Sequence, residues 1–286
     1  MEPLVVSHTY QTSPDKVWDA LTKPAEMKIW YFSVQNFVLE EKAVFTFYEV
    51  ETGGSFLHSC KILNIVPLQI FEHTWEHPSH SKGKSVVKWE ISAKNEEETT
   101  VTLTHTGIEN FADAGPAFLP ENFLMGWNHI LKVSLRNYLH GIEKLVFEID
   151  INAPREKVWQ VLWGKETYGE WTKAFIDGSY FEGEIEQGKR VHLLSPSGEG
   201  MYSDVVVLKE NEQLIFSHIG YLKDKKELPL DKDMEAWTGS QEGYELTETP
   251  SGTHLRLELD NQKEFHDEMN KKFPLALRDL KRIAEA

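Results

Sequence analysis

The chain carries one short pattern twice, first as Pro14-Asp15-Lys16-Val17-Trp18 followed by Trp30, and again as Pro154-Arg155-Glu156-Lys157-Val158-Trp159 followed by Trp171. In each copy the second tryptophan stands twelve residues after the first, and the copies are offset by 141 residues. That offset is about half of the 286 residues and too long for the repeating unit of a solenoid. We therefore predict two complete domains that arose by duplication, residues 1–142 and 143–286.

Each half continues with the same order of predicted elements. A strand at residues 5–10 or 146–151 precedes the Pro-to-Trp helix, for which Ser13 is a favourable N-cap and Pro14 a favourable first residue. Alternating apolar and polar residues then predict antiparallel strands with one covered face. An amphipathic helix closes each half, marked by Phe123, Trp127, Leu131, Leu135 and Leu139 in the first and by Met269, Phe273, Leu277 and Leu280 in the second. This order predicts an α+β fold with helices on one face of an antiparallel sheet.

Alternation also predicts which strand residues face the helix. In the first half we expect an inward face of Val87, Trp89, Ile91, Val101, Leu103 and His105, and an outward face of Lys88, Glu90, Thr102 and Thr104. A shift of one residue would invert both faces. Two further strands are expected at residues 44–50 and 55–66, joined by a turn at Gly53-Gly54.

The first half also resembles a known family. The resemblance rests on Thr12-Ser13-Pro14-Asp15-Lys16-Val17-Trp18-Asp19-Ala20-Leu21-Thr22, on the later Trp30 and on the pair Gly126-Trp127. These are similar to the START-like (SRPBCC) helix-grip superfamily and, within it, to homologues of the C-terminal domain of the heat-shock-protein-90 ATPase activator. The second half keeps the opening pattern but lacks the tryptophan near Met269.

The resemblance implies two tandem START-like helix-grip domains. In such a domain a curved antiparallel sheet wraps around a long C-terminal helix and leaves a cavity between them. Members of the superfamily bind lipids, sterols, polyketides or other apolar molecules, and some are cyclases.

Composition excludes several classes of partner. The chain has 30 basic and 46 acidic residues and a net charge of -16, which disfavours nucleic acid and anionic membrane as partners. No apolar stretch approaches the length of a membrane span, so membrane insertion is not expected. The first residues lack the basic start and apolar run of a signal peptide, and the single cysteine, Cys60, excludes an internal disulfide. These features predict a cytoplasmic protein.

Large aromatic residues suggest a candidate ligand pocket. Nine tryptophans is a high count, and rings of this size line apolar pockets as well as cores. Trp30 and Trp171 follow short helices near the predicted cavity mouth, and Trp127 and Leu131 lie on the closing helix. The remaining candidates are the strand residues Phe45, Phe47, Trp75, Trp89, His105 and Tyr244. We expect the cavity in the first domain, with Trp30 near its mouth.

Three local patterns have more than one interpretation. His105 could hydrogen-bond a ligand or act as acid or base, or it could be a core histidine satisfied by backbone or water. Residues 73–77, His-Thr-Trp-Glu-His, match the letters of a zinc-peptidase motif, but that motif needs a helix. Here the segment is typical of a strand end with solvated histidines, so no metal is predicted. The charge-dense residues 223–233 predict a solvated loop, or else a lid or partner contact, because the first half is shorter there.

The predicted function is the binding of a small hydrophobic ligand in a helix-grip cavity, without catalysis and without a cofactor. A few polar groups such as His105 would orient the ligand. Two alternatives remain open. One is a cyclase- or hydrolase-like enzyme that uses His105 as acid or base, and the other is a module that interacts with a chaperone, as the family name implies.

Overall fold

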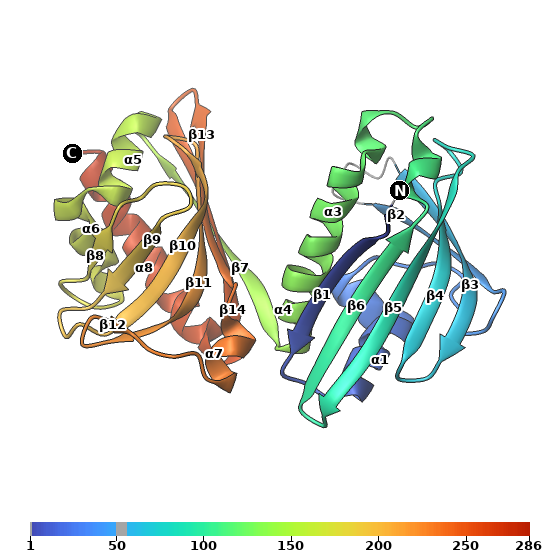
Figure 1. Cartoon of the computed structure of the whole chain (residues 1–286). Coiled ribbons are helices and arrows are strands. Elements are labelled where there is room, and N and C mark those ends of the chain that lie inside the picture. The colour runs from blue at the N-terminus through green and yellow to red at the C-terminus, as the bar shows by residue number, and fades with distance from the viewer. Residues whose placement is uncertain (1, 50–55) are drawn as a thin grey trace. The chain divides into compact units, whose positions relative to one another are not determined.

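The computed structural model describes residues 2–49 and 56–286, which form two compact units, Met1–His140 and Gly141–Ala286 (Figure 1). The predicted turn at Gly53-Gly54 lies outside the described residues. The elements of the first unit are β1 (Leu4–Tyr10), α1 (Pro14–Thr22), α2 (Pro24–Trp30), β2 (Val44–Glu49), β3 (Phe56–Val66), β4 (Ile70–Glu76), β5 (Lys84–Asn95), β6 (Glu98–Thr106), η1 (Ile108–Phe111), η2 (Pro116–Phe118), α3 (Pro120–His129), η3 (Ile130–Leu135) and α4 (Arg136–Leu139). Those of the second unit are β7 (Ile142–Ile151), α5 (Arg155–Trp163), α6 (Lys165–Trp171), η4 (Thr172–Ala174), β8 (Tyr180–Gly183), β9 (Arg190–Leu194), β10 (Gly200–Lys209), β11 (Gln213–Lys223), β12 (Lys226–Glu227), α7 (Lys232–Trp237), β13 (Gln241–Thr249), β14 (Gly252–Gln262), η5 (Lys263–Phe265) and α8 (His266–Ala284).

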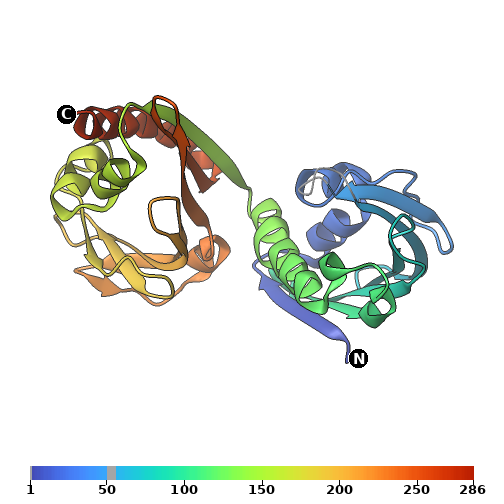
Figure 2. The same ribbon diagram turned by 90° about the horizontal axis from the view of Figure 1, so that it is seen from above.

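Each unit contains an antiparallel sheet whose strand order follows the same rule. In the first unit the order is β1-β6-β5-β4-β3-β2, and in the second it is β7-β14-β13-β11-β10-β9-β8, with β12 paired to β11. In both, the first strand of the unit pairs with the last one. Figure 2 shows the strands of each unit curving, with the closing helix across the open side. The predicted α+β helix-grip fold, present in two copies, is confirmed.

The repeated Pro-to-Trp pattern has the same structural role in both units. The Ser13 side chain caps α1 by accepting a hydrogen bond from the Lys16 backbone N–H at 3.3 Å, as predicted. The second tryptophan of each copy is buried and anchors its helix to the preceding one. The indole N–H groups of Trp30 and Trp171 donate to the carbonyls of Ala20 and Leu162, each at 3.0 Å. The pattern therefore specifies how two short helices pack together.

The predicted sheet faces of the first unit are confirmed. The inward residues Val87, Trp89, Ile91, Val101, Leu103 and His105 are all buried, whereas the alternate residues are partly exposed. The register pairs Trp89 with Leu103 and Val87 with His105 across β5 and β6, so inward side chains stand opposite one another.

The closing helix of the first unit is not a uniform α-helix. Residues four apart drift by about 40° around an α-helix, because a turn takes about 3.6 residues. A stripe that recurs every four residues from Phe123 to Leu139 would therefore wind away from the sheet. Each residue of the π-helical segment η3 turns the helix by a smaller angle than a residue of an α-helix does, which keeps the apolar residues on the side that faces the sheet. All four later members of the stripe are buried, namely Trp127, Leu131, Leu135 and Leu139. The Tyr10 hydroxyl donates to the Leu131 carbonyl inside this segment at 2.8 Å.

Neither this helix nor any other in the described part of the chain combines the length and the apolar character that crossing a bilayer requires.

Candidate functional site

Close packing fills the interior of the first unit, where the sequence suggested a cavity. Trp127 lies 5.0 Å from Trp75 and 5.8 Å from Trp89, ring centre to ring centre, and Phe47 lies 5.5 Å from Trp75. The void that Trp30 and its neighbours enclose measures about 10 Å³, which is room for about one water molecule. The prediction of a ligand-sized cavity among these rings is wrong, because the rings interdigitate at the density of ordinary cores. The candidates that lie in this interior are Trp30, Phe45, Phe47, Trp75, Trp89, His105, Trp127 and Leu131.

His105 makes two hydrogen bonds within the protein core. The Trp127 indole N–H donates to His105 Nδ1 at 3.0 Å, so Nε2 carries the proton and donates to Ser85 Oγ at 2.7 Å. The Ser85 hydroxyl in turn donates to the Trp75 carbonyl at 3.1 Å. Burial, with smaller contributions from His73 and His77, lowers the pKa of His105 to about 3. Its partners are side chains rather than the expected backbone or water, and this geometry favours a structural role.

The expectation of solvated histidines at the end of β4 is wrong. His73 and His77 are only 2% and 3% exposed, because they share the inward parity of Trp75. His73 Nδ1 donates to the Thr74 carbonyl at 2.9 Å, and His77 Nε2 accepts from the Trp75 indole at 3.1 Å. Within residues 2–49 and 56–286, no three His, Cys, Asp or Glu side chains are grouped so that they could hold a metal ion.

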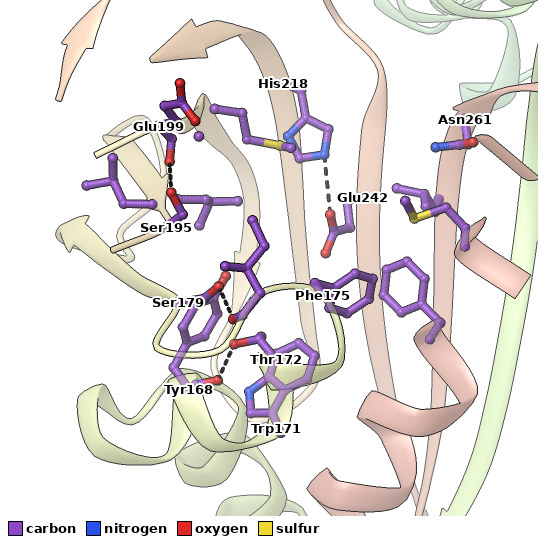
Figure 3. Close-up of a pocket in the computed structure, with 18 of the residues that line it drawn as sticks. Tyr168, Trp171, Thr172, Phe175, Ser179, Ser195, Glu199, His218, Glu242 and Asn261 are labelled. Carbon is purple, nitrogen blue, oxygen red and sulfur yellow. Dashed lines mark hydrogen bonds and ion pairs between the residues drawn. The ribbon is translucent and has the colours of Figure 1, made fainter. Parts of the chain in front are cut away.

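A ligand-sized cavity lies instead in the second unit. Its volume is about 320 Å³, and it lies between α8, the α6–η4 segment and the inner face of the sheet (Figure 3). Trp171 and Tyr244, the two candidates from the second half of the sequence, line it. Most of the wall is apolar or aromatic and includes Tyr168, Phe175, Leu193, Leu194, Met201, Trp237, Leu259, Met269 and Phe273. Pockets of a few hundred Å³ with such walls are typical of small-molecule sites.

Strand register explains why the two units differ inside. Phe71 of β4 stands opposite Trp89, and Leu214 of β11 stands opposite Tyr244. We take these two pairs as equivalent and count along the strands from them. Each inward residue of the first sheet is then matched with an inward residue of the second. The matched residues are Trp89 and Tyr244, Val87 and Glu242, and Trp75 and His218. A histidine and a glutamate therefore occupy positions that the first unit fills with a tryptophan and a valine.

A similar exchange occurs on the closing helix. The stretch Leu135-Arg136 of the first unit aligns with Leu277-Arg278 of the second, which places Met269 at the position of Trp127. The second unit thus lacks both rings of the Trp75–Trp127 contact. Both residues that replace these rings, His218 and Met269, border the cavity of the second unit.

The exchanged polar residues form a hydrogen-bonded cluster at one end of the cavity. His218 Nδ1 lies 2.8 Å from Ser203 Oγ. Its Nε2 lies 3.4 Å from Glu242 Oε2, and Figure 3 shows this second interaction. The Tyr244 hydroxyl donates to the other Glu242 oxygen. Burial, followed by the nearby Glu242 charge, raises the pKa of Tyr244 well above its ordinary value, so this hydroxyl stays protonated. Ser203 is fully buried behind His218, whereas His218 and Glu242 border the cavity.

The segment that the first half lacks contributes one wall of the cavity. Residues 226–227 add the short strand β12 to β11, and α7 follows. Trp237 of α7 stacks between His218 and Tyr221, with ring centres 5.4 and 5.3 Å away and planes nearly parallel. The charge-dense stretch is thus not simply a solvated loop, because it leads into a helix that covers the polar end of the cavity.

His218, Glu242 and Trp237 are not among the site residues predicted from the sequence. A signal was present for Glu242, which stands two residues before Tyr244 and shares its inward parity, yet carries a charge. A charged residue at an inward strand position departs from the alternating pattern, and such departures are typical of functional sites.

Comparison with known proteins places the chain in a family. The family described as "Activator of Hsp90 ATPase homolog 1-like protein" matches residues 11–140 and again residues 152–285. A comparison with curated proteins finds no match.

Solved structures offer similar chains at low identity. The Aha1 dimer from Colwellia psychrerythraea is 21% identical, with 50% of this chain and 96% of that chain covered and a TM-score of 0.40. DynU16, a putative protein in the dynemicin biosynthetic locus, is 14% identical over 100% of this chain and 98% of its own, with a TM-score of 0.41. The di-domain ARO/CYC BexL from the BE-7585A biosynthetic pathway is 12% identical over 100% and 98%, with a TM-score of 0.37. Because the family match spans most of the chain in two successive segments, the chain belongs to the family of Activator of Hsp90 ATPase homolog 1-like proteins and carries two tandem copies of its domain.

Proposed function

We propose that the protein binds a small, mainly apolar molecule in the cavity of its second unit, without converting it. The observation that carries this proposal is the cavity of about 320 Å³ with aromatic walls and one polar end. A core of this composition normally closes on itself, as the space around Trp30 in the first unit does. An open volume next to buried polar side chains is therefore better explained by an occupant than by stability.

The expected affinity follows from the area that a ligand would bury. Removing about 300 Å² of apolar ligand surface from water contributes on the order of 7 kcal/mol before the costs of association. That supports a dissociation constant in roughly the micromolar range. The polar cluster of Ser203, His218, Glu242 and Tyr244 would orient the ligand rather than supply most of the binding energy.

A neutral fluorescent probe tests this proposal. N-phenyl-1-naphthylamine should bind the full chain with one probe per chain and quench tryptophan emission, because Trp171 and Trp237 border the cavity. Met269→Trp, which restores the bulk found at Trp127, should abolish this binding while the chain stays folded. Non-saturable binding by the wild type, or unchanged binding by Met269→Trp, would contradict the assignment to this cavity.

Interaction with a chaperone is the second candidate, because the family description names an activator of Hsp90 ATPase. Pull-down of the chaperone, together with stimulation of its ATPase activity by the full chain, would support this candidate. The Met269→Trp variant separates the two functions, since a surface interaction should survive closure of the cavity. The cytoplasmic location is also proposed, and the lone buried thiol of Cys60 is consistent with it.

A further inference from the structure

The charged residues that border the second-unit cavity are unbalanced in sign. Within the described part of the chain, its lining holds Glu199, Glu242 and Asp260 and no lysine or arginine. The Asp260 carboxylate accepts a hydrogen bond from the Gln241 backbone N–H at 3.1 Å. His218, whose Nε2 lies 3.4 Å from Glu242 Oε2, supplies the basic side chain of this lining. Lys272, close to the wall, directs its ammonium group to the Phe175 carbonyl at 3.4 Å and to Glu268 at 2.6 Å. The cavity therefore favours a positive rather than a negative occupant.

Five side-chain hydrogen-bond donors of the wall are committed to the protein itself. The hydroxyls of Thr172, Ser179 and Ser195 donate to the backbone carbonyls of Tyr168, Ile176 and Glu199, at 2.6, 2.7 and 2.9 Å. The Trp171 indole donates to Leu162, and the Tyr244 hydroxyl to Glu242. A carboxylate has about four acceptor positions and no donor. A ligand that supplies donors thus complements this wall better than one that supplies acceptors.

The position of Glu242 indicates at which end of the cavity a positively charged group would bind. It occupies the inward position that Val87 holds in the first unit, at the end of the cavity that Trp237 covers. Burying a carboxylate is costly unless a counter-charge or several hydrogen bonds stabilise it. The aromatic faces around the cavity, among them Trp171, Phe175 and Phe273, attract cations as well as apolar groups.

We propose that the ligand is an amine, a small aromatic or aliphatic molecule whose ammonium group contacts Glu242 while its apolar body fills the space between the rings. This inference rests on the proposed ligand-binding function of the same cavity. It requires no chemical conversion of the ligand. Glu242 is the residue that determines specificity, and His218 and Tyr244 hold its carboxylate in place.

Three probes of nearly the same shape but different charge test the proposal. They are 1-naphthylmethylamine, 1-naphthylmethanol and 1-naphthoic acid, titrated calorimetrically into the full chain at neutral pH. The amine should bind at least about tenfold more tightly than the alcohol, and the acid should bind most weakly. Glu242→Gln should bring the amine-to-alcohol ratio close to one while the alcohol still binds. Glu245→Gln, an exposed carboxylate on the same strand, is the matched control and should leave the ratio unchanged.

Each other outcome has a distinct meaning. Equal binding of amine and alcohol, or tightest binding of the acid, would overturn the amine proposal and leave ligand binding intact. Saturable binding by none of the three probes would overturn the proposed function itself. An amine preference that persists in Glu242→Gln would refute the role of Glu242. If thermal melting shows that Glu242→Gln is unfolded, Glu242→Val takes its place in the same comparison. Valine is the residue that the first unit has at the matching position, Val87.

Discussion

His105 and Glu242 are both polar residues on the inward face of a sheet, but the protein uses them differently. Both ring nitrogens of His105 are bonded to neighbours in a filled core, so nothing of its hydrogen-bonding capacity is left for a ligand. The Glu242 carboxylate interacts with His218 and Tyr244 and still borders an open volume. His105 thus makes its contacts within the core of its unit, whereas Glu242 borders the cavity in which ligand binding is proposed.

The hydrogen bonds of His105 predict a loss of stability without a loss of binding. His105→Phe should lower the free energy of unfolding of the first unit by about 2–4 kcal/mol, because Trp127 Nε1 and Ser85 Oγ each lose a buried partner. Hydrogen exchange on the full chain in denaturant, read by mass spectrometry, measures each unit separately. Thr104→Val, on the outward face of the same strand, should change the value by less than about 0.5 kcal/mol. A variant of normal stability that no longer binds the probe would instead favour the enzyme or ligand role of His105.

Buried histidines predict that the first unit is sensitive to acid. Burial is the main cause that lowers the pKa of His73 and His77 to about 4, of His105 to about 3 and of His58 to about 2. In the unfolded chain these rings titrate near a pKa of about 6.5. Below that pH the unfolded state binds protons that the folded state does not, so stability that is complete above about pH 6.5 is lost as the pH falls toward 4.

The slope of stability against pH provides the measurement. Between about pH 5.5 and 4.5 the free energy of unfolding of the first unit should fall by about 1.4 kcal/mol per pH unit for each of these histidines. His73→Phe should reduce the slope by about that amount, since one linked proton is removed. Stability of the first unit that stays constant from pH 7 to 4.5 would contradict the assignment.

At the scale of elements, the closing helix of the first unit shows how spacing determines helix type. Apolar residues every four positions do not fit one face of a regular α-helix over four turns. The π-helical segment η3 corrects the drift, and the Tyr10 hydroxyl from β1 satisfies the Leu131 carbonyl within it. In the second unit the closing helix that packs on the sheet is α8, which is α-helical from His266 to Ala284.

The tyrosine of β1 therefore supports the π-helical segment. Tyr10→Phe should destabilise the first unit by about 1–3 kcal/mol, because the buried Leu131 carbonyl loses its donor. Hydrogen exchange of residues 130–136 should accelerate more than that of β4 or β5. Tyr48→Phe removes the hydroxyl of an exposed tyrosine in the same unit and serves as the control. Uniform acceleration across the whole unit would mean that Tyr10 stabilises the fold without any specific effect on η3.

At the scale of the whole molecule, the chain holds two copies of one fold with different interiors. The first copy fills the space between sheet and helix with tryptophans, and the second leaves about 320 Å³ open. Trp75 and Trp127, which contact each other in the filled core, are replaced by His218 and Met269 in the second unit. The copies thus differ in whether the space between sheet and closing helix is filled, although the second sheet follows the same order of strands with two strands added.

A single substitution should fill the cavity of the second unit. Met269→Trp should abolish probe binding and change the free energy of unfolding of the second unit by less than about 2 kcal/mol, because the added ring occupies existing space. Leu275→Trp adds the same ring at an exposed position of α8 and should leave probe binding intact. Destabilisation of more than about 3 kcal/mol by Met269→Trp would indicate that the cavity is too small or too rigid for the ring. Probe binding is measured by fluorescence titration and stability by hydrogen exchange in denaturant.

The sequence pattern alone predicted two copies of one domain, the α+β class and the faces of β5 and β6, because the repeated Pro-to-Trp motif and the strand alternation each involve residues close together along the chain. It also identified Trp171 and Tyr244, which line the cavity, through their correspondence with the first copy. It did not determine which unit would be open, since that depends on the summed volume of side chains from strands and a helix far apart in sequence. Trp75, Trp89 and Trp127 suggested a pocket by their size, yet the same rings meet in the folded unit and exclude one. Only the tertiary structure brought His218, Glu242 and Trp237 together, because inward parity specifies the face of a sheet and not the distance between side chains on it.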